Sequence, residues 1–266
     1  MAEVSSLNMA EALLPFPLVE RKVFANNPLF EVVCELRFPT ILRVDADVPS
    51  EFQEQVRKAF PGFERAASLN LPNLPEQVSK ILSNALPKPK YVFKTEDKVN
   101  SITLTSKNIA INCLSYQDWD AFKENVNIAV EAFIKIYSPS FFERAGLRYR
   151  NIIQRSKLSL ENVPWSELLN PMVAGELMEE GWAENVAGVQ KNVSCLIPES
   201  PDRMNFVHGL GSIKGDEEVC YVLDFDYVAD ERLEISDVYR AIERLHGYSG
   251  SAFQWAISER LKLALH

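Results

Sequence analysis

Hydrophobic and polar positions alternate with unusual regularity in the segment FEVVCELRF. Every second residue from Phe30 to Phe38 is apolar, whereas Glu31, Glu35 and Arg37 occupy positions between them. A period of two directs alternate side chains to opposite faces of a strand. The segment is therefore predicted to be a β-strand with one buried face and one polar face.

Two later segments carry apolar residues at helical spacing. In VPSEFQEQVRKAF, Pro49 suits a first helical turn, and Phe52, Val56 and Phe60 recur along one face. SYQDWDAFKENVNIAVEAFIKIY has a longer apolar stripe, formed by Trp119, Phe122, Val126, Val130, Phe133 and Tyr137. We expect a helix in each segment, the second with Ser115 as its N-cap and Pro139 after its end.

The chain between the two predicted helices has a different composition. Residues 64–90 are rich in Pro, Asn and Leu, which predicts an irregular segment with a short helix at residues 76–84. Two strands are predicted next, YVFKTE and SITLTSKNIAINCL, the latter with a turn at residues 106–108. After the second helix, FERAGLRYRNIIQR is predicted to be a further strand.

The resulting order is strand, helix, two strands, helix, strand, which is typical of a ferredoxin-like βαββαβ unit. The second half has three predicted strands, VQKNVSCLI, RMNFVHGLGSI and VCYVLDFDYV, then a helical region from Ser236 to Leu265 that bends near HGYSG. The predicted class is α+β, with antiparallel sheets and helices packed on one face, the second half being βββα. We expect an N-terminal arm at residues 1–22, a ferredoxin-like half at 23–158, and a half at 159–266 packed closely on it.

Composition narrows the classes of function. The chain has 266 residues and a formal net charge of −9, so it lacks the basic excess of proteins that bind extended nucleic acid. A local basic strip would still suit a short anionic ligand. The beginning of the chain has no basic region before its apolar run, and no stretch approaches the length of a membrane span. We therefore expect a cytoplasmic protein without membrane contact.

The sequence indicates no metal or cofactor. The four cysteines, at positions 34, 113, 195 and 220, form no CxxC pair and lie in apolar, strand-like runs where a free cysteine acts as a small hydrophobe. Only three histidines are present. No GxSxG, HExxH or P-loop motif occurs.

Three predicted strands each carry two charged residues at positions i and i+2, on the side that their apolar residues avoid. These pairs are Glu35 and Arg37, Arg148 and Arg150, and Asp224 and Asp226. Arg144 lies on the same side as Arg148. If the strands belong to one sheet, its uncovered face brings acids and arginines together.

Two interpretations of these charged pairs remain open. The simpler one is a set of cross-strand ion pairs, each contributing roughly 0.2–1 kcal/mol and keeping the sheet face in water. The sharper one is a groove in which Arg148 and Arg150 hold an anionic group, since the guanidinium fork matches carboxylate and phosphate. Asp224 and Asp226 could instead bind a hard cation, but one DxD on a strand is a weak signal for metal.

Two histidines admit a structural and a chemical interpretation. His246 lies where the last helix is predicted to bend, so it is either a capping or core residue or a ligand-binding acid or base. His208 alternates with Phe206 and Met204, which suits a buried, hydrogen-bonded strand histidine better than a general base.

Several blocks together resemble a known family. They are NNPLFEVVCELRF at 26–38, RAGLRYRN at 144–151, LDFD at 223–226, and LH at 245–246 with Phe253 and Ile257 beyond. These blocks are similar to those of a sporadically distributed family of uncharacterised bacterial proteins of about this length. The resemblance spans most of the chain and supplies no cofactor and no catalytic residues. The patchy distribution of that family implies mobile or anti-phage gene cassettes.

Two hypotheses of function follow. The first is a non-enzymatic binding protein that recognises a partner protein or a small anionic ligand, as part of a bacterial defence or toxin–antitoxin cassette. Its ligand-binding residues would be Glu35, Arg37, Arg148, Arg150, Asp224, Asp226 and His246. The alternative is a small hydrolase or transferase for a phosphate- or carboxylate-bearing substrate, with Arg148 as anion clamp and His246 or Asp224 as acid or base. A homodimer formed through an exposed edge strand is a further possibility.

Overall fold

The computed structural model describes residues 16–17, 19–20, 22, 24–66, 89–213, 215 and 217–266. Most of the predicted N-terminal arm, and all of the short helix predicted at residues 76–84, lie outside the described residues.

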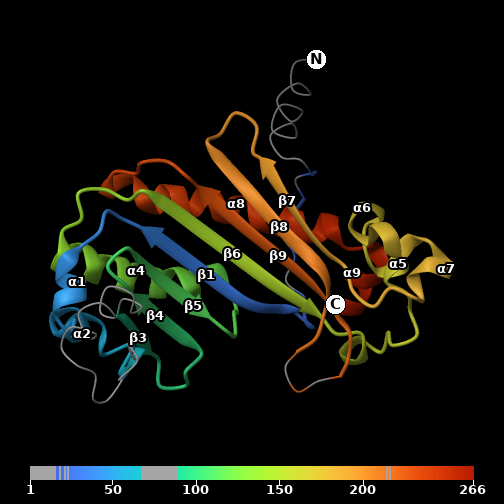
Figure 1. The fold of residues 1–266 in the computed structure, drawn as a ribbon, viewed down its shortest axis with the longest axis horizontal. Coiled ribbons are helices and arrows are strands. Elements are labelled where there is room, and N and C mark those ends of the chain that lie inside the picture. The colour runs from blue at the N-terminus through green and yellow to red at the C-terminus, as the bar shows by residue number, and fades with distance from the viewer. Residues whose placement is uncertain are drawn as a thin grey trace, which may run out of the picture. The chain divides into compact units, whose positions relative to one another are not determined.

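Nine described strands form one antiparallel sheet in the order β2-β3-β4-β5-β1-β6-β9-β8-β7 (Figure 1). The strands are β1 (Leu29–Arg37), β2 (Gly62–Ala66), β3 (Lys90–Lys94), β4 (Asn100–Leu104), β5 (Asn108–Cys113), β6 (Arg144–Ile153), β7 (Gln190–Leu196), β8 (Asp202–Gly211) and β9 (Cys220–Ala229). The predicted combination of helices with an antiparallel sheet is confirmed.

The helices are interspersed among the strands. The α-helices are α1 (Leu42–Ala46), α2 (Ser50–Val56), α4 (Trp119–Tyr137), α5 (Trp165–Leu168), α6 (Pro171–Ala174), α7 (Glu180–Ala183), α8 (Val238–Ala256) and α9 (Glu259–Leu265). The described residues also form three short 3-10 helices, η1 (Ser156–Leu158), η2 (Gly175–Met178) and η3 (Ile235–Asp237). Among the described residues, no helix has the length and apolar character needed to cross a bilayer.

The chain divides into two compact units that are not continuous in sequence. Unit 1 comprises Met1–Val32, Gly146–Glu231 and Tyr239–His266, and unit 2 comprises Val33–Ala145 and Arg232–Val238. The predicted domains 1–22, 23–158 and 159–266 were continuous segments, and that division stays a prediction. Strands β1 and β6 each contribute residues to both units.

Several predicted elements differ in detail from the structure. The prediction counted two strands in residues 91–114, whereas the structure has three, β3, β4 and β5. Residues 62–66, predicted as a helix end and an irregular segment, form strand β2. This strand pairs with β3, where Phe63 lies opposite Phe93 and stacks near Tyr91. Such a short strand depends on its cross-strand partners, which local sequence does not reveal.

The C-terminal helical region breaks at a different place from the predicted one. Helix α8 continues through the HGYSG segment, and the break lies at Ile257–Ser258, between α8 and α9. There the backbone N–H of Ser258 donates to Leu168, and the Ser258 hydroxyl accepts from the Leu261 N–H at 3.2 Å. Contact with α5 and a new N-cap therefore set the break.

In unit 2, α4 packs its apolar stripe against the buried face of the neighbouring strands. Phe122, Val126, Val130 and Phe133 are buried on the helix. Asp118 caps the helix by accepting from the Ala121 N–H at 2.8 Å, so the predicted cap at Ser115 is wrong. Asp118 has the extended backbone of an N-cap and is the residue directly before the first helical turn.

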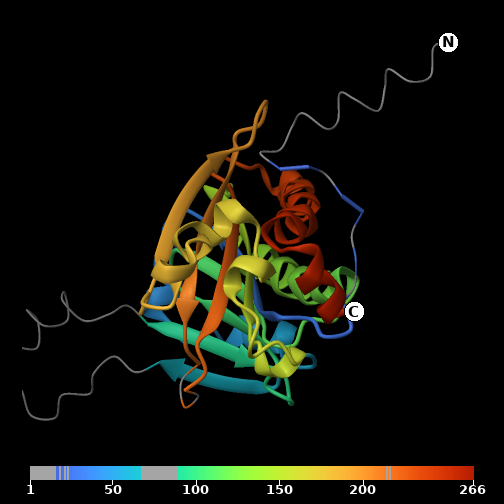
Figure 2. The same cartoon turned by 90° about the vertical axis from the view of Figure 1, so that its right-hand side faces the viewer.

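In unit 1, α8 lies along one face of the strands β8 and β9 (Figure 2). The β9 side chains on that face, Tyr221, Leu223, Phe225 and Tyr227, are all buried. Phe225 stacks on Phe206 of β8 with ring centroids 4.4 Å apart. The described residues of the predicted arm also contact α8: the Phe16 ring centroid lies 6.1 Å from the Trp255 ring centroid in a tilted arrangement, and the Val19 N–H donates to the Ser251 hydroxyl.

An ion pair anchors α8 to the start of β8. Arg244 donates through Nε and Nη2 to the two carboxylate oxygens of Asp202, at 2.6 and 2.8 Å, and the Tyr248 hydroxyl donates to the same carboxylate at 3.0 Å. Asp202 is only 1% exposed. Burial would raise the pKa of Asp202, but the hydrogen bonds and charge of Arg244 hold it below its usual value.

The Asp202→Ala variant is expected to lose about 2–3 kcal/mol of unfolding free energy, because it removes a buried carboxylate that accepts hydrogen bonds from Arg244 and Tyr248. Asp230→Ala is the matched control. Its ion pair with Arg203 is partly exposed on both sides, so its loss should cost less than about 1 kcal/mol. Urea unfolding followed by circular dichroism measures both, and equal losses would contradict the role assigned to Asp202.

Candidate functional site

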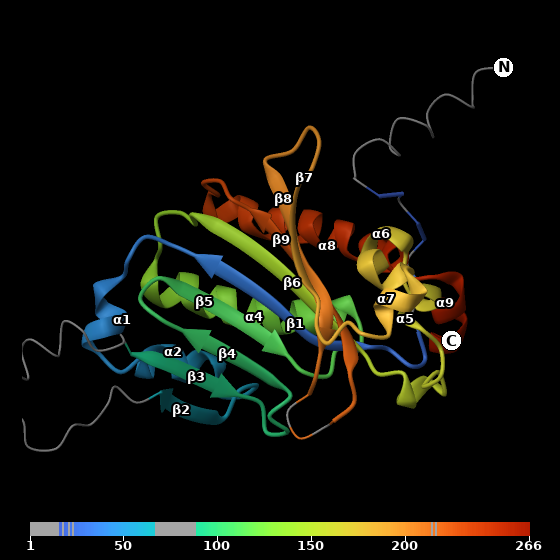
Figure 3. The ribbon, with the colours of Figure 1, turned by 45° about the vertical axis from the view of Figure 1, so that its right-hand side comes forward.

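The arginines of β6 lie on one face of the strand, as the alternation predicts. Tyr149 and Asn151 are buried on the opposite face, whereas the side chains of Arg148 and Arg150 are 42% and 32% exposed. β6 is the neighbour of β9 in the sheet (Figure 3). The guanidinium groups on β6 therefore lie next to the side chains that β9 presents on the same face of the sheet.

Asp224 of β9 joins the two arginines. Arg148 donates through Nε to Asp224 Oδ1 at 2.7 Å, and its Nη2 donates to Asp224 Oδ2. Arg150 Nε lies 3.5 Å from the same Oδ2. Because the Asp224 side chain is only 7% exposed, the bidentate fork holds a carboxylate that water barely reaches.

Glu31 of β1 completes this group. Its Oε2 lies 3.0 Å from Arg150 Nη1, and its side chain is 15% exposed. Arg150 is thus shared between Asp224 and Glu31, whereas the described partner of Arg148 is Asp224. We call Glu31, Arg148, Arg150 and Asp224, all in unit 1, the arginine cluster.

Polar contacts continue from the cluster across the next strands. Asp226, two residues beyond Asp224, accepts from Asn205 Nδ2 of β8 at 3.4 Å. The Ser194 hydroxyl of β7 lies 3.0 Å from Asn205 Oδ1. The side chains of Arg148, Asp226 and Asn205 are partly exposed, so this face of unit 1 is polar and partly open to water.

The fork with Asp224 raises the pKa of Arg148, an effect that exceeds the opposing effect of desolvation. Arg148 is therefore a permanent cation. With Nε and Nη2 bound to Asp224, its Nη1 makes no hydrogen bond to another described residue. The buried carboxylate thus fixes the orientation of a guanidinium group whose outer edge faces the solvent.

The other predicted pair, Glu35 and Arg37, belongs to a second group in unit 2. Glu35 accepts from Arg37 Nε and Arg144 Nη1, each at 2.8 Å, and from Asn108 Nδ2 at 2.9 Å. With three donors around its carboxylate, Glu35 matches the simpler interpretation, that of a cross-strand ion pair. The structure thus brings the predicted charged residues together in two sets of contacts, one in each unit.

His246 is not among the residues that the structure brings to the arginine cluster. His246 belongs to α8; its Nδ1 lies 2.7 Å from the hydroxyl of Tyr149, and the residue is buried. Tyr149 alternates with Arg148 and Arg150 along β6, so His246 lies on the opposite face of the strand from the guanidinium groups. This placement supports the predicted core role and separates His246 from the anion clamp assumed for an enzyme.

His208 is a hydrogen-bonded strand histidine. Its Nδ1 lies 2.8 Å from the Tyr221 hydroxyl, which itself donates to the Val173 carbonyl at 3.0 Å. Since the hydroxyl proton is used at Val173, Nδ1 must carry the hydrogen and donate to Tyr221. Burial and, to a lesser extent, Lys191 lower the pKa of His208 to about 4, so the ring is neutral at physiological pH.

Among the described residues, no metal-binding group lies at the arginine cluster. In the part of the chain that the structure describes, no group of three or more His, Cys, Asp or Glu side chains is arranged to hold a metal ion. Cavities of about 420, 460 and 360 Å³ are lined by other described residues. At the cluster, Asp224 is occupied by the guanidinium groups of Arg148 and Arg150.

Sequence reasoning found both arginines and both aspartates but missed some of their partners. Glu31 lies on the predicted polar face of its strand, so the alternation of apolar and polar residues could have identified it as a partner of the arginines. Asn205 and Ser194 carry no charge and lie in strands whose register the sequence leaves open. Their part in the polar face depends on the pairing of Asn205 with Asp226 and of Ser194 with Asn205.

Compared with protein families and with curated proteins, the chain matches no family model and no curated protein. The case for a function therefore rests on the geometry of the described residues.

The neutral, buried state of His208 predicts a pH dependence of stability. Its folded pKa of about 4 lies below the ordinary value of 6.5, so protonation favours the unfolded chain. Stability is complete above about pH 6.5 and should fall by up to about 3 kcal/mol as the pH drops to about 4. The His208→Gln variant keeps a hydrogen-bond donor for Tyr221, and its stability should lack this fall between pH 6.5 and pH 4.

Urea unfolding between pH 4 and pH 7.5 measures the effect, with substitution of the exposed His266 by Gln as the control. The control should keep the full pH dependence of the parent protein. If the unfolding free energies of the parent protein and of His208→Gln depend on pH in the same way, His208 is not the group responsible.

Proposed function

We propose that the protein acts by binding and not by catalysis, and that it recognises a partner protein or a small anionic ligand through Arg148. The observation that carries this proposal is the fixed, half-exposed guanidinium of Arg148, held by the buried Asp224 with its outer edge directed to solvent. A donor oriented before binding loses little conformational entropy when it meets a carboxylate or phosphate. Arginine is among the residue types enriched at the positions that dominate the binding energy of protein interfaces.

A carboxylate on a protein surface suits this geometry better than a small anion held between both arginines. Arg150 is already shared by Glu31 and Asp224, so a second anion there would have to displace a carboxylate that is almost fully buried. An acidic side chain of a partner could reach the outer edge of Arg148 without such displacement.

The enzymatic alternative has less support. It required His246 or Asp224 to act as acid or base beside Arg148. His246 contacts Tyr149 on the other face of β6, and Asp224 accepts both donors of the arginine fork. Neither group is placed to exchange a proton with a ligand bound at the outer edge of Arg148.

The proposal includes the cellular location of the protein and its genetic context. The chain composition supports a cytoplasmic location, and the family resemblance supports a place in a bacterial defence or toxin–antitoxin cassette.

A second copy of the chain is an alternative partner, since β7 is an edge strand in the sheet order.

The ferredoxin-like arrangement is also part of the proposal. It is supported by the strand order, in which β1 lies between β5 and β6 and β4 pairs with β5.

The Arg148→Gln variant is the sharpest test. Glutamine still offers an amide donor to Asp224 but removes the cation, so binding should weaken about tenfold or more while the melting temperature stays within a few degrees. Removing both arginines would leave Asp224 buried without a cation and would confuse a loss of binding with a loss of stability.

Arg57→Gln is the matched control, because Arg57 is an exposed arginine whose ion pair with Glu54 lies on α2. Affinity capture from bacterial lysate with quantitative mass spectrometry, and calorimetry with acetate, citrate and phosphate, compare the parent protein with both variants. A partner or anion retained equally by Arg148→Gln and Arg57→Gln would refute the proposal. Turnover of phosphoesters that is lost in Arg148→Gln would favour the enzymatic alternative.

A further inference from the structure

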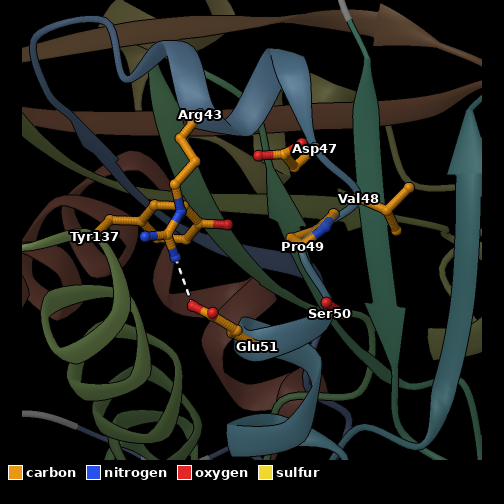
Figure 4. A pocket seen from close by; sticks show the side chains of 7 residues that line it. All are labelled: Arg43, Asp47, Val48, Pro49, Ser50, Glu51 and Tyr137. Carbon is orange, nitrogen blue, oxygen red and sulfur yellow. Dashed lines mark hydrogen bonds and ion pairs between the residues drawn. The ribbon is translucent and has the colours of Figure 1, made fainter.

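Unit 2 contains a cavity of about 420 Å³ between α1, the start of α2 and the last turn of α4 (Figure 4). Its polar lining consists of Arg43, Asp47, Ser50, Glu51 and Tyr137, and its apolar wall is the Val48–Pro49 segment. None of these residues belongs to the arginine cluster, so this cavity is independent of the function proposed above.

The cavity already holds one cation of the chain itself. The Arg43 guanidinium carbon lies 5.1 Å from the centre of the Tyr137 ring, and Arg43 Nη2 lies 2.6 Å from Glu51 Oε2. An aromatic face combined with a carboxylate is a favourable setting for a positive charge. Glu51 therefore neutralises Arg43 within the cavity.

Tyr137 is fixed in position and presents its hydroxyl to the cavity. Phe52 and Phe133 pack around its ring, with centroids at 6.4 and 5.4 Å. Desolvation, partly opposed by Arg43, raises the pKa of Tyr137 to about 12, so the hydroxyl is neutral and able both to donate and to accept. It makes no hydrogen bond to another described residue, and in Figure 4 it points into the same space as Asp47.

Asp47 supplies a carboxylate that no described residue neutralises. Its backbone is held at the end of α1, where its N–H donates to the Arg43 carbonyl at 3.0 Å and its carbonyl accepts from the Tyr91 hydroxyl at 3.4 Å. Its side chain has no hydrogen bond or ion pair with another described residue. One cation against two carboxylates leaves the lining with an excess negative charge.

We propose that this cavity binds a primary alkylammonium group. Asp47 would supply the counter-charge, and the hydroxyl oxygens of Tyr137 and Ser50 would accept the remaining N–H groups. Three acceptors match the three donors of an ammonium ion. The Val48–Pro49 wall would contact the attached methylene groups. The ligand is either a free diamine or polyamine, or the lysine side chain of a partner.

An anionic ligand fits this cavity less well. Among the described residues of the lining, the only cation is Arg43, and Glu51 already pairs with it. An anion there would face Asp47 and Glu51 without compensation, and like charges at contact distance repel. The sign of the uncompensated charge thus selects an amine.

Isothermal titration calorimetry of the full chain with 1,4-diaminobutane and with N-acetyl-lysine methylamide tests the proposal. Asp47→Asn should weaken binding about tenfold or more, because it removes the counter-ion, and Tyr137→Phe about threefold or more, because it removes one acceptor. Arg43→Gln should tighten binding, since it removes a competing cation and releases Glu51. Tighter binding of the diamine would identify a free amine as the ligand, and tighter binding of the capped lysine a partner side chain.

Glu54→Gln is the matched control, because it removes one negative charge from α2 outside the cavity lining. It should change affinity less than about twofold. The proposal fails if neither amine binds at millimolar concentration, or if Asp47→Asn and Glu54→Gln bind them equally. It also fails if acetate binds in place of the amines and is lost in Arg43→Gln. Melting temperatures of Asp47→Asn and Tyr137→Phe that equal that of the parent protein would show that the loss of binding does not come from unfolding.

Discussion

The alternation of side chains across each strand is the constraint on which the rest of the structure depends. Along β6, Tyr149 and Asn151 point to the face that α8 covers in unit 1, whereas Arg148 and Arg150 point to the opposite face. Every second residue is thereby committed either to the core or to the partly open surface. The same division places Leu223 and Phe225 in the core and Asp224 beside the arginines. A shift of one residue in any strand would exchange these two sets.

This division explains why the charges of unit 1 assemble into a structured group. Asp224 is almost fully buried, so its charge requires close partners, and the bidentate fork of Arg148 satisfies it. The same contact orients Arg148 while leaving part of it exposed. One ion pair can therefore stabilise the sheet face and prepare a binding residue, which reconciles the two interpretations of the charged pairs.

The two proposed sites differ in the sign of the charged group that they present to a ligand. At the arginine cluster a buried carboxylate positions an exposed cation, which suits an acidic group on a partner. In the cavity of unit 2 a cation of the chain is already paired with Glu51, and Asp47 retains an uncompensated charge, which suits an amine. At the arginine cluster the selectivity comes from an oriented, partly exposed guanidinium group, and in the cavity it comes from a carboxylate that no described residue neutralises.

The sequence by itself determined the class of the fold, the apolar stripe and the end of the long helix before Pro139, and the face on which each charged residue of β1, β6 and β9 lies. These features follow from the periodicity of apolar residues, which can be read along a single segment without knowing its tertiary contacts. The tertiary structure decided the strand β2, the end of α8 and the partners of each charge. Those outcomes depend on register and packing between distant segments, such as Glu31 with Arg150 and Leu168 with Ser258. The cavity beside Tyr137 was equally beyond prediction, because it depends on the packing of α4, which carries Tyr137, against α1, which carries Arg43 and ends at Asp47.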